Sequence, residues 1–313
     1  MSWKYFKLKA AEALARVFPR KVGYGVARRV ADAYVLFDRR GRDAVIHNLQ
    51  QIHEHNGTVL SPRALRALAR ENFLNFAKYM VDFFHFLHLS PERADRLINY
   101  GIVPEVFDEL LAKGKGLITL SAHLGNWELG AAAMSQRGYP INAVALWQPD
   151  PKVNELYQSY RTKRGINPIP FGRAARECIA CLRRGEIVAV LGDRDYTGGR
   201  QTVQFFGRPA RLPDGPAKLA LTTGAPILPI YMVRTQTDTF SYVLGEPIWT
   251  DRKTETVADV MDRIAAALEK VISAHSEQWY LFHDLWDVES DRRLATETAF
   301  GTSQADEPKQ AHE

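Results

Sequence analysis

The 313-residue chain has few cysteines and no long apolar run. Its two cysteines are too few for a disulfide scaffold and fit a reducing compartment. The longest stretch without a charged residue, 219–233, has 15 residues and contains two prolines. A membrane-spanning helix needs about 18–20 apolar residues. The N-terminus lacks the apolar segment and cleavage site of a signal peptide. We therefore expect a protein on the cytosolic side, soluble or bound to a surface.

Several catalytic signatures are also absent. The sequence has no G-x-S-x-G elbow, no Walker A motif and no G-x-G-x-x-G fingerprint, which argues against a serine hydrolase, a P-loop NTPase and a dinucleotide enzyme. His47, His53 and His55 lack the cysteines or ordered carboxylates of a metal site, so neither a metal nor a cofactor is expected. Cys178 and Cys181 fall inside an expected helix and are interpreted as buried small side chains.

Positive charge is concentrated at the N-terminus. The chain has a formal net charge of +5, but residues 1–29 carry eight lysines and arginines against one acidic residue, Glu12. Apolar residues such as Phe6 and Phe18 are interleaved with these cations. Each Lys or Arg near an anionic leaflet contributes about 1 kcal/mol, and apolar side chains add burial at the headgroup boundary. An anionic membrane and nucleic acid both fit this basic amphipathic segment, and so does a basic helix packed on its own domain.

Residues 1–112 are expected to be helical. Ser61 is a natural N-cap with Pro62 at the first helical position, and a long helix follows. Its apolar residues, from Phe73 to Leu87, recur at three- and four-residue steps. Such a stripe is typical of a packed core. Its aromatic density beside the basic N-terminus nevertheless favours a helical layer that associates with a membrane.

Strands and helices alternate from residue 113 to 288, and the tail 289–313 is expected to be disordered. The alternation predicts an α/β fold, an αβα sandwich with a mostly parallel central sheet. Ligands of such sheets bind at the carboxyl ends of the strands. The expected strands are 116–122, 141–147, 166–170, 187–191, 227–233 and 240–244. The expected helices are 127–137, 151–163, 173–184, 216–223 and 257–274.

The first of these strands leads into His123 and, five residues later, Glu128. On a continuous helix the two would lie about 140° apart, which disfavours a helical metal pair. A turn at Gly125 and Asn126, with Asn126 capping the next helix, would place Glu128 in the first helical turn, within reach of His123. A carboxylate on one imidazole nitrogen leaves the other free as a base, which suits removing the proton of an alcohol that attacks a carbonyl.

A second charged cluster, Asp193-Arg194-Asp195, follows another expected strand. By the carboxyl-end rule it lies in the same crevice as the first histidine. Asp193 or Asp195 would bind a metal, orient a hydroxyl group or pair with Arg161 or Arg164. The alternative is a purely structural network of ion pairs.

Five segments resemble, in order, the bacterial lipid A biosynthesis acyltransferases. That family includes lauroyl and myristoyl transferases and phosphatidylinositol mannoside acyltransferases. The resemblance covers roughly residues 20–288. It implies an αβα fold like that of glycerol-3-phosphate acyltransferases, membrane association, and transfer of a fatty acyl group from a thioester to a hydroxyl group. The five segments are 121–128, 192–195, 205–209, 213–221 and 278–283.

The resemblance also implies roles for individual residues. His123 matches the general base of the family and Glu128 its partner carboxylate. Arg161 matches an arginine near the reaction centre, and Asp193 an acidic position of the second motif. We expect Arg161, or backbone N–H groups near Gly125 and Asn126, to stabilise the oxyanion. The expected substrate-binding residues are Arg161, Asp193, Arg194, Asp195 and Asn126.

We therefore expect a peripheral O-acyltransferase on the cytoplasmic face of the bacterial inner membrane. Its donor would be an acyl carrier protein or acyl-coenzyme A, and its acceptor a hydroxyl group of a glycolipid or a lysophospholipid-type lipid. An anionic membrane lipid is an expected partner, and nucleic acid is not. Two alternatives are a hydrolase that uses His123 to activate water, and a catalytically silent protein that binds membranes or nucleic acid through its basic N-terminus.

Overall fold

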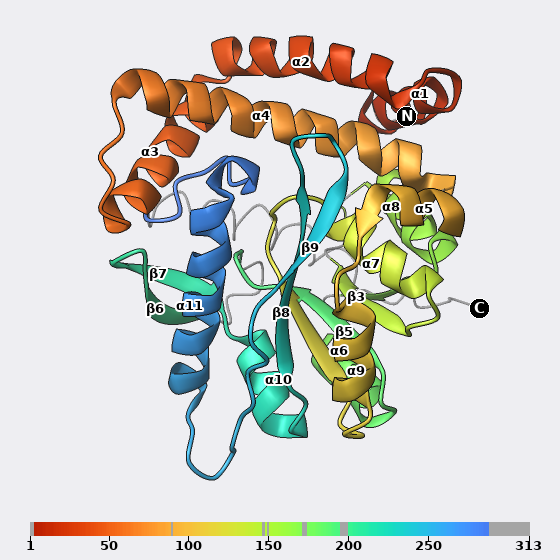
Figure 1. Cartoon of the computed structure of the whole chain (residues 1–313), viewed down its shortest axis with the longest axis vertical. Coiled ribbons are helices and arrows are strands. Elements are labelled where there is room, and N and C mark those ends of the chain that lie inside the picture. Colours follow the sequence, from red (N-terminus) through yellow and green to blue (C-terminus); the bar gives the residue numbers. More distant parts are fainter. Residues whose placement is uncertain are drawn as a thin grey trace, which may run out of the picture.

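The computed structural model describes residues 3–88, 90–145, 148, 150–170, 174–194 and 200–287. The long helices at the N-terminus lie across one end of an α/β body (Figure 1). The helices are α1 (Trp3–Val17), α2 (Arg20–Phe37), α3 (Arg39–His55), α4 (Pro62–His85), α5 (Pro91–Leu97), α6 (Val103–Leu111), α7 (Trp127–Gln136), α8 (Pro151–Lys163), α9 (Ala174–Arg183), α10 (Gly215–Thr223) and α11 (Val257–Ala274). Short 3-10 turns are η1 (Phe86–His88) and η3 (Ser276–Gln278).

Seven strands form the central sheet, in the order β1-β9-β8-β2-β5-β3-β4. Every neighbouring pair in it is parallel except β8 and β9. β6 and β7 form a separate antiparallel hairpin. The α/β class and the mostly parallel sheet are therefore confirmed. The strands are β1 (Ile98–Asn99), β2 (Leu117–Ser121), β3 (Ile141–Ala145), β4 (Asn167–Pro170), β5 (Ile187–Leu191), β6 (Arg200–Phe205), β7 (Arg208–Pro213), β8 (Ile227–Arg234) and β9 (Phe240–Leu244).

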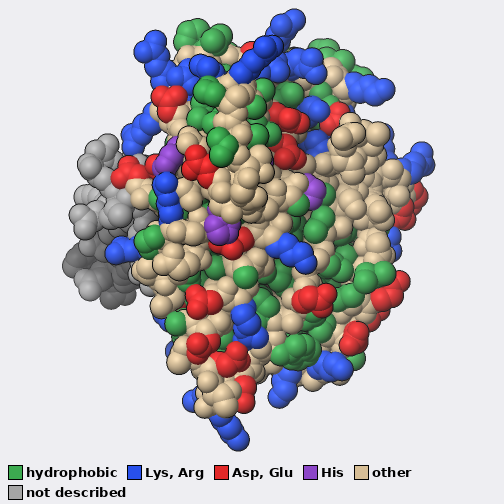
Figure 2. All heavy atoms as spheres, turned by 60° about the vertical axis from the view of Figure 1, so that its left-hand side comes forward, with side chains coloured by type: hydrophobic (Ala, Val, Ile, Leu, Met, Phe, Trp, Pro, Cys, Tyr) green, Lys and Arg blue, Asp and Glu red, His purple; other side chains and the backbone are tan. Residues whose placement is uncertain are grey.

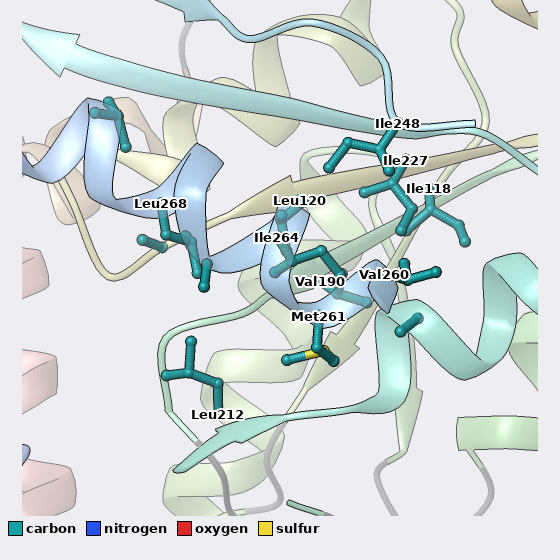
Figure 3. Packing of buried hydrophobic residues seen from close by; sticks show 14 of the residues in the cluster. Ile118, Leu120, Val190, Leu212, Ile227, Ile248, Val260, Met261, Ile264 and Leu268 are labelled. Atoms are coloured by element: carbon teal, nitrogen blue, oxygen red, sulfur yellow. The ribbon is translucent and has the colours of Figure 1, made fainter. Parts of the chain in front are cut away.

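Helices cover both faces of this sheet because successive side chains of a strand point to opposite sides. Leu117 of β2 packs in a cluster with α6 and α7, whereas Ile118 and Leu120 pack with α9, α10 and α11. In Figure 3, Ile264 and Leu268 of α11 lie against this second face. Each such aliphatic side chain contributes about 1.5–3 kcal/mol when fully buried. A one-residue slip of β2 would exchange its two faces, so this pattern fixes its register.

The helix α4 covers the carboxyl ends of the strands. It begins as expected, with Ser61 accepting a hydrogen bond from the Ala64 N–H at 3.2 Å and Pro62 in the first turn. Its aromatic stripe faces inward, since Tyr79 stacks on Trp127 with ring centroids 4.5 Å apart. The stripe therefore packs on the protein's own core. Whether the N-terminal layer associates with a membrane stays a prediction.

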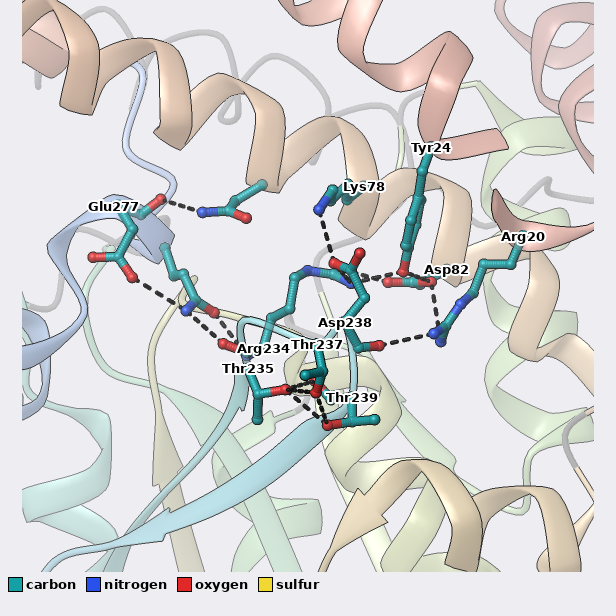
Figure 4. A network of polar contacts seen from close by, with 12 residues as sticks. Arg20, Tyr24, Lys78, Asp82, Arg234, Thr235, Thr237, Asp238, Thr239 and Glu277 are labelled. Carbon is teal, nitrogen blue, oxygen red and sulfur yellow. Dashed lines mark hydrogen bonds and ion pairs between the residues drawn. The ribbon is translucent and has the colours of Figure 1, made fainter. Parts of the chain in front are cut away.

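A buried ion pair holds α4 and α2 on the sheet. Asp82 of α4, with no exposed surface, pairs with Arg234 at the end of β8 (Figure 4). The hydroxyl group of Tyr24, from α2, donates to Asp82 at 2.7 Å and accepts from Arg234 at 2.7 Å. Burial raises the pKa of Asp82 above its ordinary value. Breaking such a pair by removing one partner costs about 3–5 kcal/mol, so this contact fixes the helical layer on the α/β body.

The expected helices and strands agree with the structure to within about two residues, apart from 146–147 and 171–173, which lie outside the described residues. Two features were missed. No strand was expected between residues 191 and 227, yet segment 205–209 is the tight turn of the β6–β7 hairpin, with Phe206 and Gly207 at φ 50° and 72°. The two-residue strand β1, within the region expected to be helical, pairs with β9. The division at residues 112 and 113 stays a prediction, and the tail 289–313 lies outside the described residues.

Both cysteines lie on α9 and are buried, as expected. Burial raises the pKa of Cys178 to about 12, so its thiol stays protonated at neutral pH.

Candidate active site

His123 and Asp193 come together because β2 and β5 are adjacent parallel strands. Ser121 and Leu191, the last residues of the two strands, are partners in the register. Two residues beyond them, the Nδ1 atom of His123 lies 2.8 Å from Oδ1 of Asp193. The backbone N–H of His123 donates to Oδ2 of Asp193 at 3.0 Å. The carboxyl-end rule thus placed the two residues correctly in one crevice, and the second contact fixes the loop after β2 on the carboxylate.

The Asp193 carboxylate is fully buried and accepts a third hydrogen bond, from the indole N–H of Trp279 at 3.0 Å. Burial raises the pKa of Asp193, but His123 and the donated hydrogen bonds outweigh burial and hold this pKa below its ordinary value. An ionised carboxylate accepts hydrogen bonds only. Nδ1 of His123 therefore carries the proton, which leaves the Nε2 lone pair as a base. Burial lowers the pKa of His123 and Asp193 raises it, with a net lowering, so the imidazole is neutral at pH 7.

The expected pairing of His123 with Glu128 is wrong. Oε1 of Glu128 accepts from Nη2 of Arg161 at 2.7 Å and from Nε of Arg161 at 3.1 Å. A guanidinium is always charged and offers several donors, whereas Asp193 already occupies Nδ1 of His123. Burial raises the pKa of Glu128, but the charge and hydrogen bonds of Arg161, together with the charges of Arg164 and His123, outweigh burial, so this pKa lies below its ordinary value. Glu128 thus holds Arg161 in place, and it acts on His123 only through its charge.

The turn between His123 and Glu128 forms as expected. Asn126 caps α7, accepting a hydrogen bond from the Leu129 N–H at 3.0 Å, and Glu128 lies in the first helical turn. Gly125 has φ +63°, and a Cβ there would lie 2.0 Å from the Met232 carbonyl oxygen, so only glycine fits. The N–H groups of Gly125 and Asn126 donate to the carbonyls of Gln278 and Met232, at 2.9 and 2.7 Å. These two N–H groups, expected as oxyanion donors, are therefore already engaged.

In the part of the chain that the structure describes, neither Arg194 nor Arg164 bonds the His123 ring, although the Arg194 charge helps to lower the pKa of His123. The Arg194 side chain donates to the Tyr280 carbonyl, and the Tyr280 N–H donates to the His123 carbonyl at 2.8 Å. Arg164 donates to the Phe83 carbonyl. Among the contacts of the described residues, neither Arg161 nor Arg164 pairs with Asp193. Asp193 instead orients the imidazole of His123, a partner that was not among the three alternatives, and Asp195 lies outside the described residues.

Trp279 is a contributor that sequence reasoning missed. Segment 279–286 could be a lipid cleft wall or a core segment, and nothing in the pattern singled out an indole that binds Asp193. Two further rings of the C-terminal segment and α7 complete the surroundings. Trp127 makes an edge contact with His123, with centroids 5.2 Å apart, and Tyr280 is 6.3 Å from Trp127. Trp279 lies near the site because it forms an isolated β-bridge with Leu124. This pairing can be recognised only once the fold is known.

A narrow apolar chamber opens beside these residues, between the sheet and the α6–α7 layer. Its volume is about 100 Å³. Ser121, Trp127, Glu128 and Arg161 line one end, at the carboxyl ends of the strands. The other end is apolar. Between the two ends, the small side chains of the sheet and α7 leave the chamber open. The apolar end is lined by Phe107, Met134, Ile141 and Ile166, and the small residues are Gly130, Ala131, Ala143 and Ala189.

The chamber has the shape and chemistry for one flexible apolar chain. A bulky ring system would need a wider cavity, and a polar ligand would need more than the few polar groups at one end. A chain held there would present its first polar atoms near Glu128, Arg161 and the Trp127 ring that contacts His123. Within the described residues, no group of three or more His, Cys, Asp or Glu side chains is placed to hold a metal ion.

Comparison with known proteins gives this geometry its context. The model of a family described as bacterial lipid A biosynthesis acyltransferase matches residues 2–287. The chain belongs to this family. A phosphatidylinositol mannoside acyltransferase of Mycobacterium tuberculosis (strain CDC 1551 / Oshkosh) is 29% identical over 192 residues, 59% of this chain and 60% of the relative. One of the same name from Mycolicibacterium smegmatis is 23% identical over 232 residues, 72% of this chain and 75% of the relative.

The similarity to the Mycobacterium tuberculosis relative thus spans about 60% of that protein. The family resemblance stated from the five sequence segments is confirmed. Among the described helices, none combines the length and the apolar character that crossing a bilayer requires.

Proposed function

We propose that this protein transfers a fatty acyl chain from an acyl thioester to a hydroxyl group of a glycolipid, with His123 as the general base. One observation carries the proposal: in a member of an acyltransferase family, the His123 imidazole is fixed by a buried carboxylate and contacts Trp127, which lines one end of a narrow apolar chamber. The chamber takes the acyl chain of the donor. The donor carrier is an acyl carrier protein or coenzyme A.

The reaction begins when Nε2 of His123 takes the hydroxyl proton while the acceptor oxygen attacks the thioester carbonyl. A C–O bond forms, and the carbonyl electrons move to oxygen in a tetrahedral intermediate. The C–S bond then breaks, and the imidazolium returns the proton to the leaving sulfur. Asp193 stabilises the imidazolium, the role that we first expected of Glu128. No residue of the protein becomes acylated.

The oxyanion is stabilised by Arg161. The two backbone N–H groups considered for this role are engaged elsewhere, whereas Arg161 lines the chamber and is held by Glu128. A guanidinium has five N–H donors, so donors remain after two bind the carboxylate. One well-placed donor to an oxyanion lowers the barrier by about 2.7–4 kcal/mol. Asn126 and Arg194 act by holding the loops around His123, through the cap of α7 and the Tyr280 carbonyl.

The protein is a peripheral membrane protein in this proposal, since its acceptor is a lipid. Large apolar side chains are exposed at the outer surface of the N-terminal helices, where a soluble domain gains nothing from them. On α1 these residues are Phe6, Leu14 and Val17. The cytoplasmic face of the inner membrane is where acyl carrier protein and acyl-coenzyme A donors occur, and it remains the location that we predict.

The test is a transfer assay with purified protein. Labelled acyl-coenzyme A or acyl carrier protein would be supplied with phosphatidylinositol mannoside or a lipid A precursor in detergent, and acylated lipid measured. His123→Ala should lower transfer by about 100- to 10,000-fold. His55→Ala, at an exposed histidine outside the site, is the matched control and should leave the rate unchanged. Free fatty acid released at the same rate with and without any acceptor would indicate a hydrolase instead.

A further inference from the structure

A cationic groove lies on α2, outside the apolar chamber. It is formed by Lys21, Arg28 and Arg29 of α2, by Arg70 and Lys78 of α4, and by Asp238 in the turn between β8 and β9. With Asp32, also in its lining, the groove has five cationic side chains and two carboxylates. The formal excess is therefore three positive charges.

The excess charge is carried by α2 alone. Arg70 pairs with Asp32 at 2.6 Å, and Lys78 pairs with Asp238 at 2.8 Å. In Figure 4, Asp238 also receives the Arg20 side chain, which donates to its carbonyl at 2.8 Å, so the floor of the groove is neutral and fixed. Lys21, Arg28 and Arg29 have no ion pair among the contacts of the described residues. Three cations thus remain available to an anionic ligand.

The spacing on α2 places this groove beside an exposed apolar stripe. Positions 21, 25, 28 and 32 recur at steps of four and three residues, so they form one flank of the helix. Gly25 lies in the middle of that flank, and a Cβ there would meet nothing within 4 Å. The next flank is apolar and exposed, with Val22, Val26, Val30 and Tyr34 at four-residue steps. Figure 2 shows Lys and Arg side chains gathered with hydrophobic ones at the end of the molecule formed by the N-terminal helices.

The two flanks together select the ligand. A soluble phosphate compound or a nucleic acid would use the cations and leave the stripe in water, where it has no function. The surface of an anionic bilayer uses both, because apolar side chains lie at the acyl boundary while Lys and Arg contact headgroup phosphates. The stripe from residue 22 to 34 is about 18 Å long at 1.5 Å per residue, enough to lie across several headgroups.

We propose that the groove of Lys21, Arg28 and Arg29 binds the phosphate of an anionic lipid headgroup while α2 lies flat in the bilayer surface. This rests on the proposed function only in taking the membrane as the place where the protein acts. The Tyr24 contact with Asp82 and Arg234 holds α2 on the body, and α4 lies between α2 and the active site. A headgroup in the groove would therefore fix the orientation of the whole α/β body on the bilayer.

The experiment is vesicle flotation of the full-length protein. Vesicles of phosphatidylcholine alone would be compared with vesicles containing phosphatidylglycerol, across a salt series. The variant Lys21→Gln/Arg28→Gln/Arg29→Gln removes the three unpaired cations. The control Lys113→Gln/Arg252→Gln/Lys253→Gln removes three exposed cations from loops at the opposite end of the molecule (Figure 1). Both lower the net charge equally, so only position differs.

We expect the groove variant to lose about 100-fold in partitioning onto anionic vesicles, roughly fivefold for each charge, and the control to bind like the wild type. Equal loss in both variants would overturn the groove as a site, as would full binding by the groove variant. Titration with inorganic phosphate and with glycerol phosphate tests the other source, and saturable binding as tight as that to vesicles would overturn the lipid assignment. The His123→Ala protein should float like the wild type, so failure of the groove and failure of the catalytic proposal give different results.

Discussion

Replacing Asp193 by Asn tests the reasoning about the catalytic pair most sharply. The change keeps the size and shape of the side chain but puts an amide NH2 group where an oxygen stood. Oδ2 of Asp193 receives two N–H groups that can only donate, the His123 backbone and the Trp279 indole, both at 3.0 Å. The remaining amide oxygen must therefore stay at that position, and the new NH2 group faces Nδ1 of His123.

An NH2 group can only donate, so Nδ1 becomes an acceptor and the proton moves to Nε2. The unprotonated nitrogen is then Nδ1, and Nε2 can no longer accept the proton of the acceptor hydroxyl group. Loss of the correct tautomer in a comparable His–Asp pair lowers kcat about 10⁴-fold, equivalent to about 5.4 kcal/mol in activation free energy. The steady-state acyl transfer rate measures this loss directly. Asp284→Asn is the matched control, since Asp284 pairs with His47 at 2.7 Å and makes no bond to His123 among the contacts of the described residues.

The pH profile gives an independent readout. The neutral imidazole is the active form, so kcat/KM rises with pH through the His123 pKa and reaches a plateau above it. Burial already lowers this pKa, and Asp193 opposes the lowering. In Asp193→Asn only the charge of Glu128 still opposes burial, so the acid limb should move to lower pH while the plateau falls. A variant with wild-type plateau and wild-type acid limb, folded by circular dichroism, would refute the assignment of Asp193.

Three further predictions follow from other contacts. Glu128→Gln removes the charge that holds Arg161, so turnover should fall at least tenfold, while the acid limb of the pH profile stays close to that of the wild type. An acid limb shifted as far as in Asp193→Asn would contradict the separate roles of the two carboxylates. Met134→Ala extends the chamber and should raise kcat/KM for longer acyl-coenzyme A chains relative to shorter ones. The control Met261→Ala changes the core on the other face of the sheet and should leave this ratio of kcat/KM values unchanged. Arg234→Met leaves a buried carboxylate without its partner and should cost about 3–5 kcal/mol in urea unfolding; a cost below 1 kcal/mol would contradict the role of this pair.

Much of the fold could be predicted because its signals are local. Alternating apolar runs and turns identified the strands, and the rule that ligands bind at carboxyl ends placed His123 and Asp193 in one crevice. Ser61 and Asn126 were predicted as N-caps because capping depends on residues within one helical turn. The β6–β7 hairpin was missed because its turn combines Phe206 with Gly207 in left-handed conformations, which a phenylalanine rarely adopts.

The partner of His123 could not be predicted because the choice depends on sheet order. Glu128 is five residues away and Asp193 seventy, and sequence proximity favoured the first. The register of β2 against β5 brings Asp193 to the imidazole, and the start of α7 turns Glu128 toward α8. Trp279 reaches the same carboxylate from a segment a further 86 residues along the chain. None of these contacts has a signature in the neighbouring residues.

The apolar chamber affects the stability of the folded protein. The side chains that line it make fewer van der Waals contacts than those of a close-packed core. Under the proposed function, a fatty chain bound there would complete this packing. Donor binding and stability would then be linked, because a ligand at 100 times its Kd stabilises the native state by about 2.7 kcal/mol. The concentration of the acyl donor would then affect the stability of the folded protein.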